Sequence, residues 1–171
     1  ANALNCRMDF IQERGELIIE HLRRWSGWNT TGSAPFGSTF VGRLDMTRVG
    51  LVGHSRGGEG AIIAPSRLAA APIAGVSIGT VFAITPTDAY GMTPDGIPFA
   101  TIFGGCDGDV YTLEARHVYD RLLDSATPAA QSQVFFPPAN HNFFNSEWLY
   151  DDNLISPQCS TSDLAGTTVQ Q

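Results

Sequence analysis

Residues 53–57, Gly-His-Ser-Arg-Gly, constrain the fold of this chain more than any other stretch. An apolar run typical of a strand, 48–52, comes before them, and small apolar residues that can form a helix, 58–64, follow. A serine at such a junction sits in a sharp, strained turn that lifts its hydroxyl above the sheet. We therefore expect Ser55 to be a nucleophile and both glycines to be needed to avoid collisions. The turn also directs the first helical amides, beginning with that of Arg56, toward a developing oxyanion.

A second stretch, residues 75–79, has the same Gly-x-Ser-x-Gly form around Ser77. The residues that follow it, 80–84, are mostly β-branched or aromatic, which is typical of a strand rather than a helix. Ser77 therefore lacks the strand-to-helix context, and we predict a structural role for it.

A nucleophilic serine needs a base to take its proton and a third group to orient that base. After a turn of this kind, the acid and then the histidine follow along the chain. His117 lies in an amphipathic helical pattern, 113–123, where a surface position is expected. His141 follows a short strand, 133–136, on a loop of the sort that carries catalytic groups. We therefore predict that His141 is the base.

The acid is expected in the loop that follows the strand predicted at 98–103. Asp107 lies nearer the end of that strand than Asp109 does, so Asp107 is preferred and Asp109 is the alternative. Both can also be read as ordinary turn residues, because glycines flank them. Asp88 and Asp95 are weaker candidates, since prolines and glycines mark their stretch as a loop between strands.

These motifs resemble those of the α/β-hydrolase superfamily. The turn at 53–58 resembles the one in plant chlorophyllases, cutinase-type polyester hydrolases and secreted bacterial esterases. The segments 106–109 and 140–144 look most like the secreted bacterial group. The resemblance extends over about residues 40 to 150. It implies a partial α/β-hydrolase fold, in which a mostly parallel sheet is flanked by helices in three layers.

The resemblance also implies an activity. Ser55, Asp107 and His141 would form the catalytic triad, and the reaction would be ester hydrolysis through an acyl-enzyme without a cofactor. Serine peptidase or amidase activity is the nearest alternative, because the same triad serves both reactions. A non-catalytic binding module of the same fold is a second alternative. The sequence does not indicate the acyl chain, the alcohol or the oligomeric state.

The connection at 86–98 is short, whereas large cap domains of this superfamily are inserted near that point. We therefore expect no large cap domain and an open cleft for a small-molecule or polymeric ester. The side chains that could line the cleft are His54, Tyr90, Met92, Phe143, Phe144 and Trp148. Ordinary packing is the alternative for each of them.

Only 54 residues precede Ser55, too few for the strands that normally come before this turn. One of the missing loops would supply the second oxyanion amide. We therefore expect a fragment that lacks a transition-state donor worth about 3 kcal/mol, which leaves an inactive fragment as a further alternative.

The composition excludes several classes of protein. The net charge of −7 argues against nucleic-acid binding, and no apolar run is long enough to span a bilayer. All ten basic residues are arginine, so lysine Schiff-base chemistry and a P-loop are excluded. No Cys or His spacing indicates a metal site. The length fits one domain, which we place at 1–150, followed by an irregular polar tail at 151–171.

The chain has three cysteines: Cys6, Cys106 and Cys159. We predict a bridge between Cys106 and Cys159 if the protein is exported, because such a bridge would hold the polar tail beside the proposed acid. A secreted or extracytoplasmic location is expected, with the cytoplasm as the alternative.

Hydrophobic periodicity predicts the remaining elements. Apolar residues from Leu4 to Trp25 recur at three- and four-residue steps, which indicates an amphipathic helix that Gly27 ends. Further strands are expected at 80–85, 99–103 and 133–136, and further helices at 57–70 and 113–123. Alternation of strands with helices predicts parallel pairing.

Overall fold

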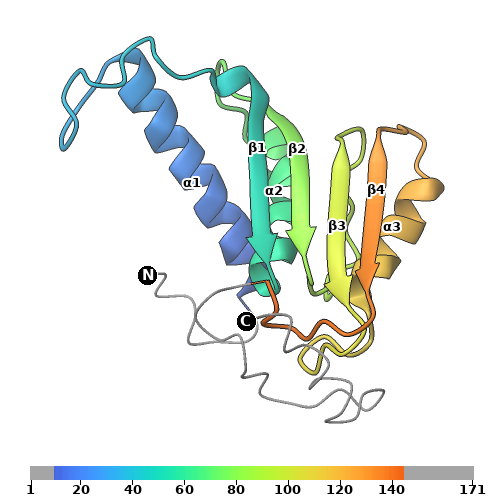
Figure 1. Ribbon diagram of the computed structural model, residues 1–171. Helices are drawn as coiled ribbons and strands as arrows, with labels where there is room; N and C mark the ends of the chain where they lie inside the picture. The colour runs from blue at the N-terminus through green and yellow to red at the C-terminus, as the bar shows by residue number, and fades with distance from the viewer. Residues whose placement is uncertain (1–9, 145–171) are drawn as a thin grey trace.

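Four runs rich in β-branched and aromatic residues form a single parallel sheet in the computed structural model, which describes residues 10–144. The strands are β1 (Val49–His54), β2 (Ile78–Ile84), β3 (Phe99–Gly104) and β4 (Gln131–Phe136). They lie side by side in the order in which they occur along the chain, and every adjacent pair is parallel (Figure 1).

Three α-helices accompany the sheet within the described residues: α1 (Ile11–Thr30), α2 (Arg56–Ala70) and α3 (Glu114–Leu123). Helix α2 packs on β1 and β2, α3 packs on β3 and β4, and α1 packs mainly on α2. A short 3-10 helix, η2 (Met46–Arg48), leads into β1. The predicted α/β class with a parallel sheet is therefore confirmed, as part of a three-layer arrangement. The described part of the chain contains no large cap domain.

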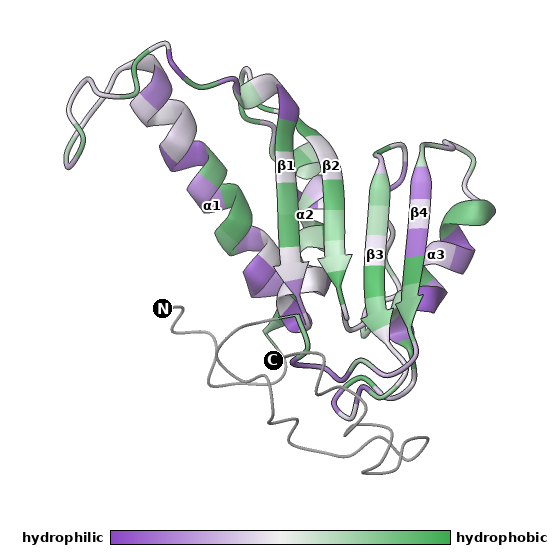
Figure 2. Cartoon of the chain, in the orientation of Figure 1, coloured by the Kyte–Doolittle hydropathy of each residue, from purple (hydrophilic) through white to green (hydrophobic). Residues whose placement is uncertain are grey.

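The hydrophobic core lies between the sheet and these helices. Its apolar cluster includes Ile19 and Leu22 of α1, Ile62 of α2, Val81 of β2 and Phe99 of β3. On the opposite face of the sheet, Val52 is 69% exposed and Val134 45% exposed. Figure 2 shows that β4 begins hydrophilic and ends hydrophobic.

Two glycines allow α1 and α2 to approach closely. A Cβ on Gly60 would lie 2.9 Å from the Arg14 Cβ, and a Cβ on Gly15 would lie 3.1 Å from the Ile63 Cγ2. Larger side chains at these positions would separate the helices and open the core that α1 shares with the sheet.

The predicted end of the first helix is wrong. Helix α1 continues past Gly27 to Thr30, because an unobstructed glycine is tolerated inside a helix. Gly32, with φ of 68°, ends it instead, and the amides of Thr31 and Gly32 both donate to the Gly27 carbonyl at 3.0 and 3.2 Å. The predicted turns around Leu4 and Met8 lie outside the described residues, as does the expected domain boundary at 150.

The expected alternation of strands and helices is wrong at one connection, where the short loop predicted between two strands is confirmed. Strands β2 and β3 are joined by the loop 85–98, which contains no helix, although the two strands are parallel. The other crossovers, through α2 and α3, follow the expectation. Within residues 10–144, none of the helices combines the length and apolarity that crossing a bilayer requires.

Candidate functional site

The carboxyl ends of all four strands meet at one edge of the sheet, which is where ligands bind in open parallel sheets. Ser55 follows β1 at this edge, and Asp107 follows β3. After β4, the segment 137–144 runs beneath the sheet and back toward the end of β1 (Figure 1). Along this path His141 comes into contact with His54, the last residue of β1.

The turn at Ser55 has the strain expected of it. Ser55 has φ of 56° and ψ of −131°, a conformation that side chains rarely adopt, directly before the first residue of α2. Its amide donates to the Ile84 carbonyl at 2.9 Å, and its carbonyl accepts from the Gly58 amide at 2.8 Å. The side chain makes no capping hydrogen bond to the helix. The half-buried hydroxyl is therefore not used to cap α2.

The glycines of the turn are not equivalent. A Cβ on Gly53 would lie 2.1 Å from the Gly57 carbonyl oxygen, and a Cβ on Gly58 would lie 2.9 Å from the Pro86 Cβ. Among the described residues, a Cβ on Gly57 would meet nothing within 4 Å outside the backbone of its own helix. The expectation that Gly57 avoids a collision is therefore wrong, and Gly58 has that role instead.

His141 and Asp107 are held together in a buried pair. The His141 Nδ1 lies 2.8 Å from the Asp107 Oδ2, and the two residues are 3% and 2% exposed. The other carboxylate oxygen, Oδ1, accepts from the amides of Asp109 at 3.0 Å and Val110 at 2.6 Å. Because a carboxylate only accepts, Nδ1 carries the proton of this hydrogen bond, and in the neutral form of the ring Nε2 is then the acceptor. This is the tautomer that a general base requires.

Two glycines allow the loop carrying Asp107 to approach the segment carrying His141. A Cβ on Gly104 would lie 2.0 Å from the Ala139 carbonyl oxygen, and a Cβ on Gly105 would lie 2.7 Å from the Pro137 carbonyl oxygen. The Cys106 amide donates to the Ala139 carbonyl at 3.0 Å. Sequence reasoning did not assign this role to the paired glycines, although their position at the end of β3 was a signal for it.

Asp109 lies near the other nitrogen of the same ring. Its Oδ2 is 3.9 Å from the His141 Nε2, and its side chain is 35% exposed. The two aspartates that compete as the acid in the sequence therefore approach different ring nitrogens. Asp107 has the position that orients a base, whereas Asp109 lies on the side from which a base takes its proton.

His54 connects the turn to the segment that carries the base. Its Nε2 lies 2.9 Å from the His141 carbonyl oxygen, and the two imidazole rings are 4.6 Å apart between centroids. Since a carbonyl only accepts, His54 Nε2 carries a proton. Burial lowers the pKa of His54, the hydrogen bond to the His141 carbonyl opposes this, and the adjacent His141 lowers the pKa further. His54 is thus a contact between the two parts of the site.

The contact between the turn and the segment after β4 is made by His54, the residue directly before Ser55. Among the described residues, no hydrogen bond joins the Ser55 hydroxyl to the His141 ring.

Glu59, a residue that sequence reasoning missed, ties the loop 85–98 to α2. It is 2% exposed, and its carboxylate accepts from the Thr87 hydroxyl at 2.5 Å and from the Tyr90 amide at 2.8 Å. The amides of Glu59 and Thr87 also approach the Ser55 carbonyl, at 3.3 and 3.4 Å. A single acidic residue within the small, apolar stretch that follows the turn was the available signal.

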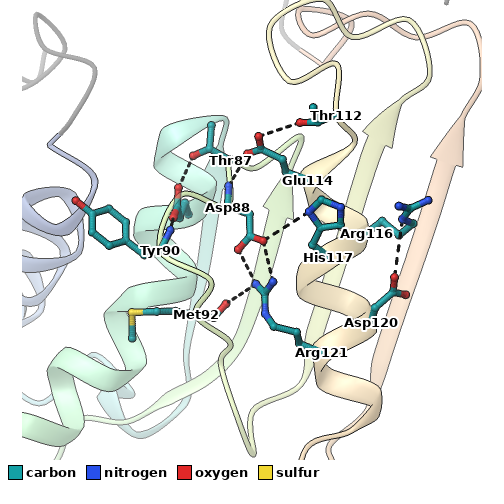
Figure 3. A network of polar contacts seen from close by, with 11 residues as sticks. Thr87, Asp88, Tyr90, Met92, Thr112, Glu114, Arg116, His117, Asp120 and Arg121 are labelled. Carbon is teal, nitrogen blue, oxygen red and sulfur yellow. Dashed lines mark hydrogen bonds and ion pairs between the residues drawn. The ribbon is translucent and has the colours of Figure 1, made fainter.

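The same loop is tied to α3 by Asp88, one of the weaker acid candidates (Figure 3). Its carboxylate forms two hydrogen bonds with Arg121, at 2.5 and 2.8 Å, and its amide donates to Glu114 at 2.7 Å. His117 lies 3.8 Å from the same carboxylate, with a side chain that is 43% exposed. Asp95, the other weak candidate, accepts from the Ser125 hydroxyl at 2.7 Å. These contacts give both aspartates a structural role in the loop.

The residues predicted to line a cleft are spread over three segments. His54 ends β1, and Tyr90, which is 42% exposed, lies with Met92 on the loop between β2 and β3. Phe143 and Phe144 form an aromatic cluster with Phe136. Trp148 lies outside the described residues.

Ser77 and Cys106 complete the predicted positions. The Ser77 hydroxyl donates to the Thr47 carbonyl at the start of the sheet, far from the carboxyl edge. Cys106 is disulfide-bonded. The other two cysteines of the chain, Cys6 and Cys159, lie outside the described residues, so the pairing with Cys159 stays a prediction.

The residues near the site do not form a metal centre. Within residues 10–144, no group of three or more histidine, cysteine, aspartate and glutamate side chains has the arrangement of a metal site.

In comparisons with protein-family models and with curated proteins, nothing matches this chain. The resemblance to α/β-hydrolases therefore stays a prediction from its motifs.

Proposed function

We propose that this chain is a serine hydrolase that cleaves carboxylic esters through an acyl-enzyme. The observation that supports this most strongly is the buried pair of Asp107 and His141, which lies beside the strained turn at Ser55. Along the chain, Ser55, Asp107 and His141 follow one another in the order nucleophile, acid and base, which is the order of the fold that the motifs resemble. In sites without substrate, catalytic hydrogen bonds are often long and shorten only when substrate binds. The lack of a bond between Ser55 and His141 is therefore compatible with the proposal.

In the first half of the proposed reaction, the Ser55 Oγ attacks the acyl carbon while the His141 Nε2 takes the hydroxyl proton. The buried carboxylate of Asp107 holds the ring in this tautomer and stabilises the imidazolium that forms. The amide of Arg56, at the start of α2, donates to the carbonyl oxygen as it becomes negative. The imidazolium then protonates the alcohol oxygen, and the alcohol leaves.

In the second half, water takes the place of the alcohol. His141 removes a proton from the water, the resulting hydroxide attacks the acyl carbon, and the Ser55 Oγ leaves with that proton. The products are the carboxylic acid and the free enzyme, so the reaction needs no cofactor.

The bonded state of Cys106 supports the expected export of the protein. Disulfides persist in oxidising compartments and are uncommon in the cytosol. A secreted or extracytoplasmic esterase acting on small-molecule or polymeric esters is the form of the proposal that fits this cysteine.

A serine-reactive fluorophosphonate probe and a p-nitrophenyl ester test the proposal on the full chain. We expect the wild type to be labelled and to release p-nitrophenol, and Ser55→Ala to abolish both. Ser77→Ala is the matched control, because Ser77 occupies the same five-residue pattern. His141→Gln is expected to lower turnover by several orders of magnitude.

The outcomes separate the proposal from its alternatives. Labelling that survives Ser55→Ala would remove Ser55 as the nucleophile. A labelled protein that cleaves p-nitroanilides faster than the matching esters would favour a peptidase or amidase. A folded protein that neither labels nor turns over an ester would favour a binding module of the same fold.

A further inference from the structure

The carboxylate of Asp109 is a charged group that the proposed chemistry does not use. Its Oδ2 lies 3.9 Å from the His141 Nε2, and its side chain is 35% exposed, whereas the paired Asp107 side chain is 2% exposed. The Asp109 amide is held by the Asp107 carboxylate at 3.0 Å, so the loop fixes where the residue sits. Asp109 therefore presents a negative charge to solvent beside the reactive side of the base.

Within the described part of the chain, no arginine pairs with this carboxylate. Its one ion-pair contact there is with His141, which carries a positive charge only when protonated. As far as residues 10–144 are concerned, no permanent cation therefore neutralises the charge on Asp109.

Asp109 lies near the nitrogen of His141 that transfers the proton in the proposed reaction. In the proposed reaction, Nε2 delivers a proton to the alcohol oxygen, so the alcohol portion of the ester must lie next to this nitrogen. A group attached to the alcohol by a short linker then lies within a few ångströms of Asp109. At such a distance and in a partly solvated site, two unit charges interact strongly enough to alter selectivity several-fold.

We propose that Asp109 is a specificity-determining residue that favours esters of cationic alcohols, such as quaternary ammonium alcohols, over neutral and anionic ones. This inference rests on the proposed function. Two further features agree with it. Phe143 and Phe144 follow the base in the chain and form a cluster with Phe136, and aromatic faces attract quaternary ammonium groups. The net charge of −7 also attracts cations to the molecule as a whole.

A pair of substrates of the same shape isolates the effect of charge. Acetylcholine and 3,3-dimethylbutyl acetate differ only in that a quaternary nitrogen replaces a quaternary carbon. The experiment measures kcat/KM for both esters with the full chain at low ionic strength. Because both reactions use the same base, any effect of Asp109 on the protonation of His141 cancels in the ratio of the two values.

We expect the wild type to favour the cationic ester by about threefold to tenfold, and Asp109→Asn to bring the ratio close to one. Asp120→Asn is the matched control, since it removes an exposed carboxylate on α3 that pairs with Arg116. Added salt is expected to reduce the preference of the wild type, because the carboxylate is partly exposed. This salt dependence keeps the inference testable even if Asp109→Asn fails to fold.

Three results would overturn the inference: equal kcat/KM values in the wild type, a preference that survives Asp109→Asn, or a preference that salt does not reduce. Hydrolysis of both esters at equal rates would remove the inference and leave the proposed function intact. A folded protein that hydrolyses neither ester and resists the fluorophosphonate would remove the proposed function, and the inference with it.

Discussion

Alanine at Gly53 should destabilise the protein, whereas alanine at Gly57, the other glycine of the Gly-x-Ser-x-Gly turn, should not. In Gly53→Ala, the new Cβ would lie 2.1 Å from the Gly57 carbonyl oxygen, 2.5 Å from its carbon and 2.8 Å from the Gly58 amide nitrogen. All three are backbone atoms in the first turn of α2, so no flexible side chain can move aside. In Gly57→Ala, the Cβ would meet nothing within 4 Å in residues 10–144 outside its own helix backbone.

The sizes of the two effects follow from these contacts. Forcing extra atoms into a packed position typically costs about 1–3 kcal/mol, and Gly53→Ala belongs at the upper end because the backbone must shift. Alanine is favoured over glycine inside a helix by about 0.5–1 kcal/mol. Gly57 lies at the helix start, where this gain is smaller, so we expect Gly57→Ala to be neutral or slightly stabilising. The melting temperature should then fall by roughly 2–10 °C in Gly53→Ala alone.

Urea unfolding followed by tryptophan fluorescence measures both free energies of unfolding. The slope of the free energy of unfolding against urea concentration must be the same in the wild type and both variants for the comparison to hold. Turnover of a p-nitrophenyl ester should also fall in Gly53→Ala, because the shift of backbone moves Ser55. A Gly53→Ala variant as stable as the wild type would refute the reasoning, as would a Gly57→Ala variant that is equally destabilised.

Three further predictions concern the acid, the loop clamp and the histidine of the turn. Asp107→Asn should lower kcat by about 10³- to 10⁴-fold with little change in KM, because an amide can hold the His141 ring in the wrong tautomer. A loss of kcat below tenfold in a p-nitrophenyl ester assay would contradict this. Arg121→Met should reduce the free energy of unfolding by about 1–3 kcal/mol, because it leaves the nearly buried Asp88 carboxylate without its arginine partner. The control is Arg116→Met, which breaks an exposed ion pair. It should change the free energy of unfolding by less than about 0.5 kcal/mol in the same urea experiment. The pKa of His54 lies below its ordinary value of 6.5, so the unfolded chain binds a proton at this histidine more readily than the folded protein does. The wild type should therefore lose stability as the pH falls below 6.5, and His54→Gln should lose less stability over the same range. A urea midpoint with the same pH dependence in both proteins would contradict this.

The local structure around Ser55 could be predicted from the sequence because neighbours in the chain determine it. An apolar run, a glycine, a serine and a helix-forming stretch specify the strained turn, and the structure confirms strand β1 and helix α2 on either side. The expectation that a side chain in place of glycine would collide with its surroundings was correct at Gly53 and wrong at Gly57. The pattern alone does not tell which glycine lies under the backbone of the following turn.

Features that depend on distant contacts were harder to predict. The end of α1 was placed at Gly27, because a glycine after a periodic run usually marks a helix end. The role of Glu59 was missed, because its hydrogen bonds go to Thr87 and Tyr90, which belong to a loop about thirty residues further along the chain. The structural roles of Asp88 and Asp95 also depend on α3 and on the segment that follows it.

The amino-acid sequence by itself determined the parallel α/β class, the turn at Ser55 and the order of the candidate nucleophile, acid and base. These follow from hydrophobic periodicity and from conformational preferences that act over a few residues. Only the tertiary structure decided which nitrogen of His141 each aspartate approaches, and that His54 holds the segment after β4 against the end of β1. The physical reason is that these contacts join segments up to 87 residues apart, whose meeting depends on how the strands pair and how the loops pack.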